Sequence, residues 1–410
     1  MAGAVSPLAP ERFPDLPPIA GVRLGAERCG IRYRDRRDLM LATLVPGTAV
    51  AGVFTRSLTP GAPVDWCRRA LPHATARAII VNSGNANVFT GRAGQDAVAA
   101  TAAAAARIIG CDPHEVYVAS TGVIGETLPV AKILAALPAA HAGASADGWG
   151  TAVEAIMTTD TFPKGATCRA TIGGTSVTIN GIAKGSGMIA PDMATMLAFV
   201  FTDATLPAPL LQALLGAANA RSFNCITVDG DTSTSDTALL VATGQARHPA
   251  PAAAADPLLK DFRRALETVM TDLAQQIVRD GEGAEKFVTI TVTGARSARA
   301  ARRIGLAIGN SPLVKTALAA GDANWGRIVM AVGKSGEEAD RDRLAITVGG
   351  TRIAANGGPV PGYDEGPVAS HMAGRDIAIA IDLGLGHGRA TVWTCDLTHR
   401  YIDINGSYRS

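Results

Sequence analysis

Short apolar runs separated by turn residues dominate the hydropathy pattern of the chain. The clearest run is Met196 to Phe201, six apolar residues in succession, which is typical of a strand buried on both faces. The stretch before it contains a glycine-rich turn, Lys184-Gly185-Ser186-Gly187, followed by Pro191. The pattern therefore places Thr195 where a glycine-rich loop leads into a buried strand.

Further strands are predicted from alternating or continuous apolar segments bounded by turn residues. They lie at 29–33, 39–45, 49–55, 78–82, 116–119, 168–172, 176–182, 224–228, 237–243, 287–292, 344–348, 377–383 and 390–395. Gly173-Gly174 separates two of them, and this pair predicts a two-residue hairpin turn.

Helices are predicted between these strands, at 94–110, 128–137, 148–157, 207–220, 257–279, 297–308 and 312–320. The fifth has the strongest pattern, because its apolar residues recur at spacings of three and four and form one face. We expect Gly110 to end the first helix and Ser297 to cap the start of the sixth.

Composition narrows the class of protein. Of 410 residues, 47% are hydrophobic but only 4% aromatic, so the core is expected to consist of Ala, Val, Ile and Leu. The net charge is +2, and this balance does not indicate a nucleic-acid partner. No apolar stretch is long enough to cross a bilayer, and residues 1–25 lack the apolar centre of a signal peptide. We expect a cytoplasmic protein that does not bind membranes.

Metal sites and disulfides are not expected. The six cysteines are scattered without C-x-x-C spacing, and the seven histidines show no metal-ligand spacing. The acidic run 229–236 is similar to a calcium loop, but Leu240 occupies the position of the bidentate glutamate. We interpret this run as a hydroxyl-rich hairpin that lines the functional site.

Thr195 is a candidate nucleophile. A threonine hydroxyl needs an adjacent base, and a free α-amino group on the same residue supplies one at neutral pH. That amino group becomes free only if the chain is cut between Ala194 and Thr195. Spacing alone favours an ordinary loop leading into a strand, because Ala-Thr is common before strands.

Three more polar stretches have alternative interpretations. Ser120-Thr121-Gly122 is either a simple turn or a pair of donors for an oxyanion. The run 82–87 either ties down its own backbone or forms one wall of a polar pocket. Lys184 either belongs to a phosphate loop, although the full G-x-x-x-x-G-K-[ST] pattern is absent, or holds a substrate carboxylate.

A resemblance decides between several of these alternatives. The segment KGSGMIAPDMATML resembles the self-cleavage segment of the ornithine acetyltransferase family, the bifunctional enzymes of arginine biosynthesis. Other segments resemble signatures of that family in the same order, and the resemblance covers nearly the whole chain. They are 82–87, 120–125, 158–164, 228–236, 280–286 and 405–410.

The resemblance implies a fold and a division of the chain. The implied fold is α/β, a layered helix–sheet–sheet–helix sandwich. It resembles N-terminal-nucleophile enzymes but has the family's own topology, with a smaller C-terminal α/β part. Self-cleavage would give an α fragment, 1–194, and a β fragment, 195–410, whose tail folds back to the active site. Two copies of each would form a heterotetramer.

The resemblance also implies the site residues. Thr195 is the nucleophile, Thr121 and Gly122 form the oxyanion hole, and Glu282 approaches the nucleophile and the substrate amine. The remaining substrate contacts implied are Thr158, Lys184, Asn405 and Ser410.

The implied reaction moves an acetyl group from N-acetylornithine to glutamate by ping-pong chemistry through acetyl-threonine. No cofactor is implied, although acetyl-CoA is a second candidate acetyl donor. One rival interpretation is a self-cleaving aminopeptidase or amidase, in which water takes the acyl group. Another is a catalytically silent binding or assembly protein, against which the intact candidate site argues.

Overall fold

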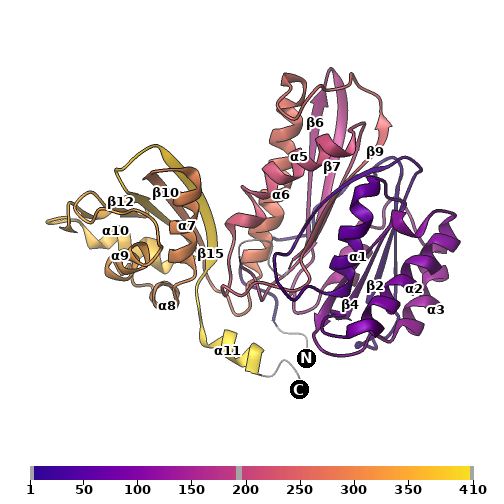
Figure 1. Cartoon of the computed structure of the whole chain (residues 1–410). Coiled ribbons are helices and arrows are strands. Elements are labelled where there is room, and N and C mark those ends of the chain that lie inside the picture. Colours follow the sequence, from indigo (N-terminus) through magenta and orange to yellow (C-terminus); the bar gives the residue numbers. More distant parts are fainter. Residues whose placement is uncertain (1–3, 191–195, 407–410) are drawn as a thin grey trace.

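The structure is a computed structural model, and it describes residues 4–190 and 196–406. Its larger part contains two sheets that face each other, with helices on the outside, and a third sheet with its own helices forms a smaller C-terminal part (Figure 1). The predicted helix–sheet–sheet–helix sandwich and the smaller α/β part are both confirmed.

The first sheet has four strands in the order β1-β2-β4-β5. An apolar cluster joins its outer face to helices α2 and α3, while α1 packs beside β5. The bounds are β1 Val22–Glu27, β2 Leu39–Leu44, β4 Ala78–Asn85, β5 Val116–Val123, α1 Ala62–Ala70, α2 Gly91–Ile109 and α3 Val130–Ala142.

The second sheet has five strands in the order β3-β9-β8-β7-β6. Helices α5 and α6 cover its outer face. The bounds are β3 Ala49–Phe54, β6 Lys164–Ile172, β7 Thr175–Lys184, β8 Leu197–Ala204, β9 Thr237–Ala246, α5 Ala208–Asn219 and α6 Lys260–Arg279.

Strand β8 lies at the centre of the second sheet, as its sequence predicts. It pairs antiparallel with β7 and parallel with β9. Phe199 and Phe201 point from it into the core between the two sheets, where helix α4 (Trp149–Ile156) also packs. Trp149 meets Phe201 edge to face, with ring centroids 5.4 Å apart. Each buried phenylalanine stabilises the sandwich by roughly 1.5–3 kcal/mol.

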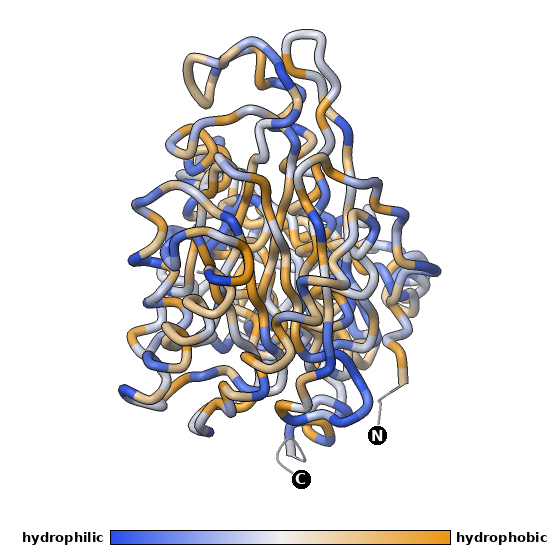
Figure 2. The backbone as a smooth tube through the Cα atoms, turned by 90° about the vertical axis from the view of Figure 1, so that its right-hand side faces the viewer, coloured by the Kyte–Doolittle hydropathy of each residue, from blue (hydrophilic) through white to orange (hydrophobic). Residues whose placement is uncertain are grey.

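Polar and apolar segments separate clearly along the chain. The central strands are mainly apolar, whereas many of the loops at the edges of the molecule are hydrophilic (Figure 2). The hairpin of β6 and β7 turns through Gly173 and Gly174, which both have positive φ, 56° and 88°. This is the two-residue turn that the sequence predicts.

The third sheet has six strands in the order β13-β12-β11-β14-β10-β15. Its apolar cluster includes residues of helices α7 to α10. The bounds are β10 Phe287–Ala295, β11 Ala345–Val348, β12 Thr351–Ala355, β13 Gly358–Pro359, β14 Asp376–Asp382, β15 Gly388–Cys395, α7 Ala298–Gly309, α8 Pro312–Ala319, α9 Trp325–Gly333, α10 Glu365–Ala373 and α11 His399–Gly406.

Two strand predictions are wrong. Segment 29–33 forms bends, because both carboxylate oxygens of Asp38 accept backbone hydrogen bonds, from Cys29 N and Ile31 N, each over 2.6 Å. Segment 224–228 contains a short 3-10 turn and one bridge between Ile226 and Trp393. The run 229–236 is therefore a loop and not part of a hairpin, and β9 pairs with β3 and β8 instead.

Candidate active site

A cavity of about 280 Å³ lies where the ends of β5 and β7 meet several loops. This volume suits a ligand of roughly amino-acid size, since sites for drug-sized ligands span about 300–1,000 Å³. Six of the sequence-predicted site residues line it: Thr121, Gly122, Thr158, Lys184, Glu282 and Asn405. Three others, Ala194, Thr195 and Ser410, lie outside the described residues.

Thr121 and Gly122 lie near the C-terminal end of strand β5, and the local backbone requires glycine at the second position. Gly122 has a φ of 132°, and a Cβ there would lie 2.3 Å from the carbonyl carbon of Gly84 on β4. An L side chain is excluded both by this φ and by the close approach of the neighbouring strand. The geometry thus brings a hydroxyl and a glycine N–H to one wall of the cavity.

Lys184 ends strand β7 and reaches Thr121. Its Nζ donates to Thr121 Oγ1 over 3.2 Å, and its side chain is 3% exposed. An ammonium only donates, so the hydroxyl hydrogen of Thr121 does not point at Lys184 and is available to the cavity. Lys184 is therefore in contact with the proposed oxyanion donor Thr121, and the sequence did not indicate this contact.

Glu282 and Asn405 come from distant parts of the chain. Asn405, on α11, donates through Nδ2 to Glu282 Oε2 over 2.8 Å. The backbone N–H of Glu282 donates to Ser186 O over 3.0 Å. A Cβ on Gly187 would lie 2.4 Å from the Glu282 carboxyl group. The glycine-rich turn after Lys184 therefore leaves space for this carboxylate.

Thr158 and its neighbours approach the cavity from the loop after α4. The backbone N–H of Thr158 donates to Asp160 Oδ2 over 2.9 Å, and Thr159 Oγ1 and Ser186 Oγ are 2.7 Å apart. The loop is thereby attached to the glycine-rich turn that follows β7.

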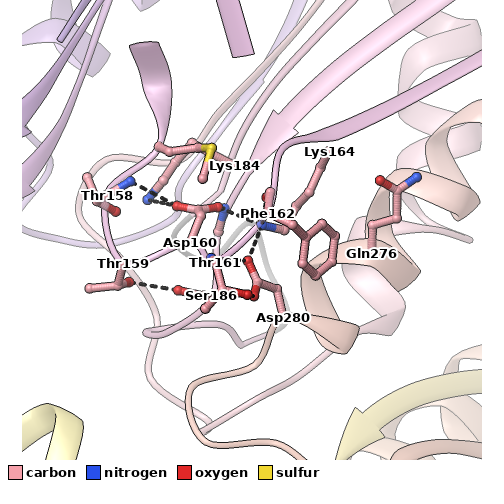
Figure 3. Close-up of polar contacts among 12 residues, drawn as sticks. Thr158, Thr159, Asp160, Thr161, Phe162, Lys164, Lys184, Ser186, Gln276 and Asp280 are labelled. Atoms are coloured by element: carbon pink, nitrogen blue, oxygen red, sulfur yellow. Dashed lines mark hydrogen bonds and ion pairs between the residues drawn. The ribbon is translucent and has the colours of Figure 1, made fainter. Parts of the chain in front are cut away.

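A buried cluster of charges lies behind this loop, and it consists of Asp160, Lys164 and Asp280 (Figure 3). Lys164 Nζ donates to Asp160 Oδ1 over 2.7 Å and to Asp280 Oδ2 over 2.5 Å, and all three side chains are fully buried. Burial acts to lower the pKa of Lys164, but the two carboxylates outweigh it and raise that pKa. The sequence places these residues in family-like segments but does not show that they meet.

Two further aspartates accept hydrogen bonds from backbone N–H groups on the two sides of residues 191–195. Asp229 accepts hydrogen bonds from the backbone N–H groups of Met188 and Ile189, over 2.6 and 2.9 Å. Asp236 Oδ1 accepts from Met196 N over 3.0 Å, and burial raises the pKa of Asp236 well above its ordinary value. Ser233, Thr234 and Ser235 are among the residues that line the cavity, as predicted for this hydroxyl-rich run.

The asparagine side chains of 82–87 mainly form hydrogen bonds with backbone groups. Asn82 Nδ2 donates to Asn85 O, and Asn87 Nδ2 donates to Gly94 O, over 2.8 and 3.0 Å. Among the described residues that line the cavity, only Ala86 comes from this run. The structure therefore favours the first of the two interpretations, a loop that ties down its own backbone.

Comparison with known proteins identifies the family to which this cavity and fold belong. The chain matches the ArgJ family over residues 23–410. The chain belongs to the ArgJ family. Its similarity to ArgJ proteins extends over the whole length, since it is 62% identical over 406 residues to the arginine biosynthesis bifunctional protein ArgJ of Gluconobacter oxydans, with 99% of this chain and 96% of that protein covered.

Two more ArgJ proteins are similar to this chain, one over its whole length and one over about half of it. The protein from Brucella suis is 56% identical over 413 residues, with 100% of both chains covered. The crystal structure of ArgJ from Bacillus halodurans shows 39% sequence identity and a TM-score of 0.49, covering 51% of this chain and 98% of that one. The predicted family of bifunctional arginine-biosynthesis enzymes is confirmed by the sequence matches.

Within 4–190 and 196–406, no group of three or more His, Cys, Asp or Glu side chains is arranged to hold a metal ion. No helix in the described part of this ArgJ-family chain is long and apolar enough to span a membrane.

Proposed function

We propose that this enzyme transfers the acetyl group of N-acetylornithine to glutamate through an acetyl ester on Thr195. The observation that carries the proposal is the single cavity in which Thr121, Gly122, Lys184 and Glu282 meet. Hydroxyl and ammonium donors on one wall and a carboxylate on another suit a substrate with an acetyl carbonyl and a charged amino-acid end.

The first half-reaction forms the ester. The Thr195 α-amino group takes the hydroxyl proton as Oγ attacks the acetyl carbonyl carbon, and Thr121 and Gly122 stabilise the oxyanion. The C–N bond then breaks, and the proton goes to the departing ornithine amine, with Glu282 beside it. Thr158, Lys184, Asn405 and Ser410 bind the carboxylate and amine ends of the amino acids.

The second half-reaction returns the nucleophile. The amino group of glutamate attacks the ester carbonyl, and its proton passes to the Thr195 α-amine. The ester C–O bond then breaks, Thr195 Oγ takes that proton back, and N-acetylglutamate is released. Water has to be kept from the ester at this stage, since hydrolysis would waste the acetyl group. Acetyl-CoA is a second candidate donor for the same ester.

Thr195 gains a free α-amino group only after the chain is cut at Ala194. The proposal therefore includes self-cleavage into fragments 1–194 and 195–410, which remain associated and pair as a heterotetramer in the cytoplasm. Continued association of the two fragments is supported by the burial of Ala190 and Met196, which are 3% and 2% exposed and lie in the two different fragments.

Mass spectrometry of the denatured protein tests the proposal. We expect two fragments that meet at Ala194 and Thr195, and after incubation with N-acetylornithine the C-terminal fragment should gain the mass of one acetyl group. Glutamate should then remove that group and yield N-acetylglutamate. Peptide mapping should place the acetyl group on Thr195.

Two outcomes would contradict this proposal. Cleavage without acetyl uptake, combined with release of free acetate or of amino acids from peptides, favours the hydrolase interpretation. A single uncut chain that takes up no acetyl group contradicts the Thr195 mechanism altogether.

The rate of ester formation is expected to depend on pH in a bell shape. The Thr195 α-amine has to be unprotonated, so the rate should rise through about pH 7.7–8.0. The mechanism needs Lys184 as an ammonium, since a neutral amine could accept the Thr121 hydroxyl hydrogen and divert it from the oxyanion, and burial lowers the pKa of Lys184 below the ordinary 10.5. A lysine with a lowered pKa loses its charge earlier as pH rises, so the alkaline decline should begin below that value.

The charged groups around Lys184 influence the pH at which the rate declines on the alkaline side. Asp160, Glu282 and Asp236 act to raise its pKa, and Lys164 acts to lower it. Single-turnover acetylation measured from about pH 6 to about pH 11 checks the profile. A rate that stays flat beyond the ordinary lysine pKa would show that the charge on Lys184 is not needed.

A further inference from the structure

The Lys184 ammonium has two oxygen acceptors nearby, a hydroxyl and a carboxylate, and it donates to the uncharged hydroxyl. Its Nζ is 3.2 Å from Thr121 Oγ1 but 3.9 Å from Asp160 Oδ2. A buried ammonium beside a free carboxylate normally closes to a charge-assisted hydrogen bond of about 2.7–2.9 Å. Because this pair does not close, something else must satisfy the Asp160 carboxylate.

Lys164 is that group. Asp160 Oδ1 accepts from Lys164 Nζ over 2.7 Å and from Gly185 N over 2.6 Å, while Oδ2 accepts from Thr158 N over 2.9 Å. Burial acts to raise the pKa of Asp160, but Lys164 and then Lys184 outweigh it, so that pKa lies well below its usual range. Asp160 is thus ionised, and Lys164 Nζ and two backbone N–H groups already donate to it.

A second carboxylate fixes the position of Lys164. Asp280 Oδ2 accepts from Lys164 Nζ over 2.5 Å, and Asp280 also accepts hydrogen bonds from the backbone and hydroxyl groups of Thr161. Figure 3 shows Lys164 between Asp160 and Asp280, with Lys184 on the far side of Asp160. Asp280 therefore holds the Lys164 ammonium beside Asp160.

We propose that Lys164 is a positioning residue: by occupying the Asp160 carboxylate, it leaves the Lys184 ammonium bonded to Thr121, so that the Thr121 hydroxyl hydrogen points into the cavity. This inference rests on the proposed function, because it assigns a role to the oxyanion donor of that reaction. Lys164 itself does not line the cavity, so it acts through Asp160 and Lys184.

Removal of the Lys164 charge has a specific consequence. In Lys164→Met, Lys184 becomes the remaining cation within ion-pair distance of Asp160 among the described residues. The Lys184 ammonium then moves the short distance to Asp160 and releases Thr121. With no donor to its oxygen, the Thr121 hydroxyl is free to rotate away from the developing oxyanion.

The test compares Lys164→Met with two double variants of equal charge. Lys164→Met/Asp160→Asn removes the carboxylate that would capture Lys184. Lys164→Met/Asp280→Asn removes the other carboxylate that binds Lys164, which is not the one next to Lys184. Each double variant deletes one buried positive and one buried negative charge, so each serves as the control for the other if the single variant folds poorly.

We measure kcat and KM for acetyl transfer, counting only chains that mass spectrometry shows to be cleaved. In Lys164→Met, kcat should fall about 10- to 100-fold, less than the 10²- to 10³-fold cost of losing an oxyanion donor outright. Lys164→Met/Asp160→Asn should return kcat to within about 5-fold of the unaltered enzyme, whereas Lys164→Met/Asp280→Asn should stay at least about 10-fold below it.

Equal kcat values for the two double variants, or a higher value for the Asp280→Asn one, would overturn the proposal. They would show that Lys164 only stabilises the fold by pairing buried carboxylates. Thermal melting temperatures recorded in parallel report that stabilising role separately. Failure of the proposed function is distinguishable, because in that case the unaltered enzyme itself transfers no acetyl group.

Discussion

Replacing Thr195 by alanine is expected to leave one uncut chain and to reduce acetyl transfer by at least about 10⁴-fold, the scale on which losing a covalent nucleophile acts. Two functions fail together, because the same hydroxyl is proposed to attack the Ala194 carbonyl and the acetyl group. Denaturing mass spectrometry reports the cut, and a coupled assay of ornithine release reports the transfer.

Thr195→Ser is the matched control for this result. Serine keeps the hydroxyl and the α-amino group, so cleavage and transfer should both persist, at reduced rates. Cleavage at the same bond in Thr195→Ala, or transfer near the normal rate, would assign the nucleophile to another residue.

The second large effect is expected at the oxyanion site. Thr121→Val keeps the shape of the side chain but removes the hydroxyl, and kcat should fall about 10²- to 10³-fold with a smaller change in KM. The loss falls on kcat because the donor is needed when negative charge develops. Stability should fall by about 1–3 kcal/mol as well, since the buried Lys184 ammonium loses its acceptor.

Ser120→Ala supplies the control. Ser120 precedes Thr121 on β5 and donates to Asn82 Oδ1 over 2.6 Å, away from the cavity lining. It should cost comparable stability and leave kcat within about 3-fold of the original value. If Ser120→Ala lowers kcat as much as Thr121→Val, the effect belongs to the strand and not to the hydroxyl.

Local sequence was sufficient to predict the elements whose causes are local. The buried run of β8, the Gly173-Gly174 turn and the apolar face of α6 all depend on neighbours within a few residues. The prediction at 29–33 was wrong because one side chain, Asp38, takes two backbone donors that a strand would need. The pattern of apolar residues does not indicate such a hydrogen bond between a side chain and the backbone.

The candidate site was predictable only in part. Family-like segments indicated Thr121, Lys184 and Glu282, and the structure brings them to one cavity. The same segments did not indicate that Lys164 meets Asp280, 116 positions away. From sequence alone, a charged residue in a predicted loop is expected to be exposed to solvent. Whether it is buried depends on whether the fold brings a distant residue of opposite charge to it.

The strand order of the second sheet determines how the two proposed fragments would be joined after cleavage. Strands β3, β6 and β7 precede the cut and β8 and β9 follow it, so the order β3-β9-β8-β7-β6 interleaves the two fragments in one hydrogen-bonded ladder. The proposed cut would thus convert a one-chain protein into a two-chain complex whose strands share one sheet. Its refolding then becomes a bimolecular reaction whose yield depends on concentration, whereas the uncut chain refolds at a rate independent of dilution.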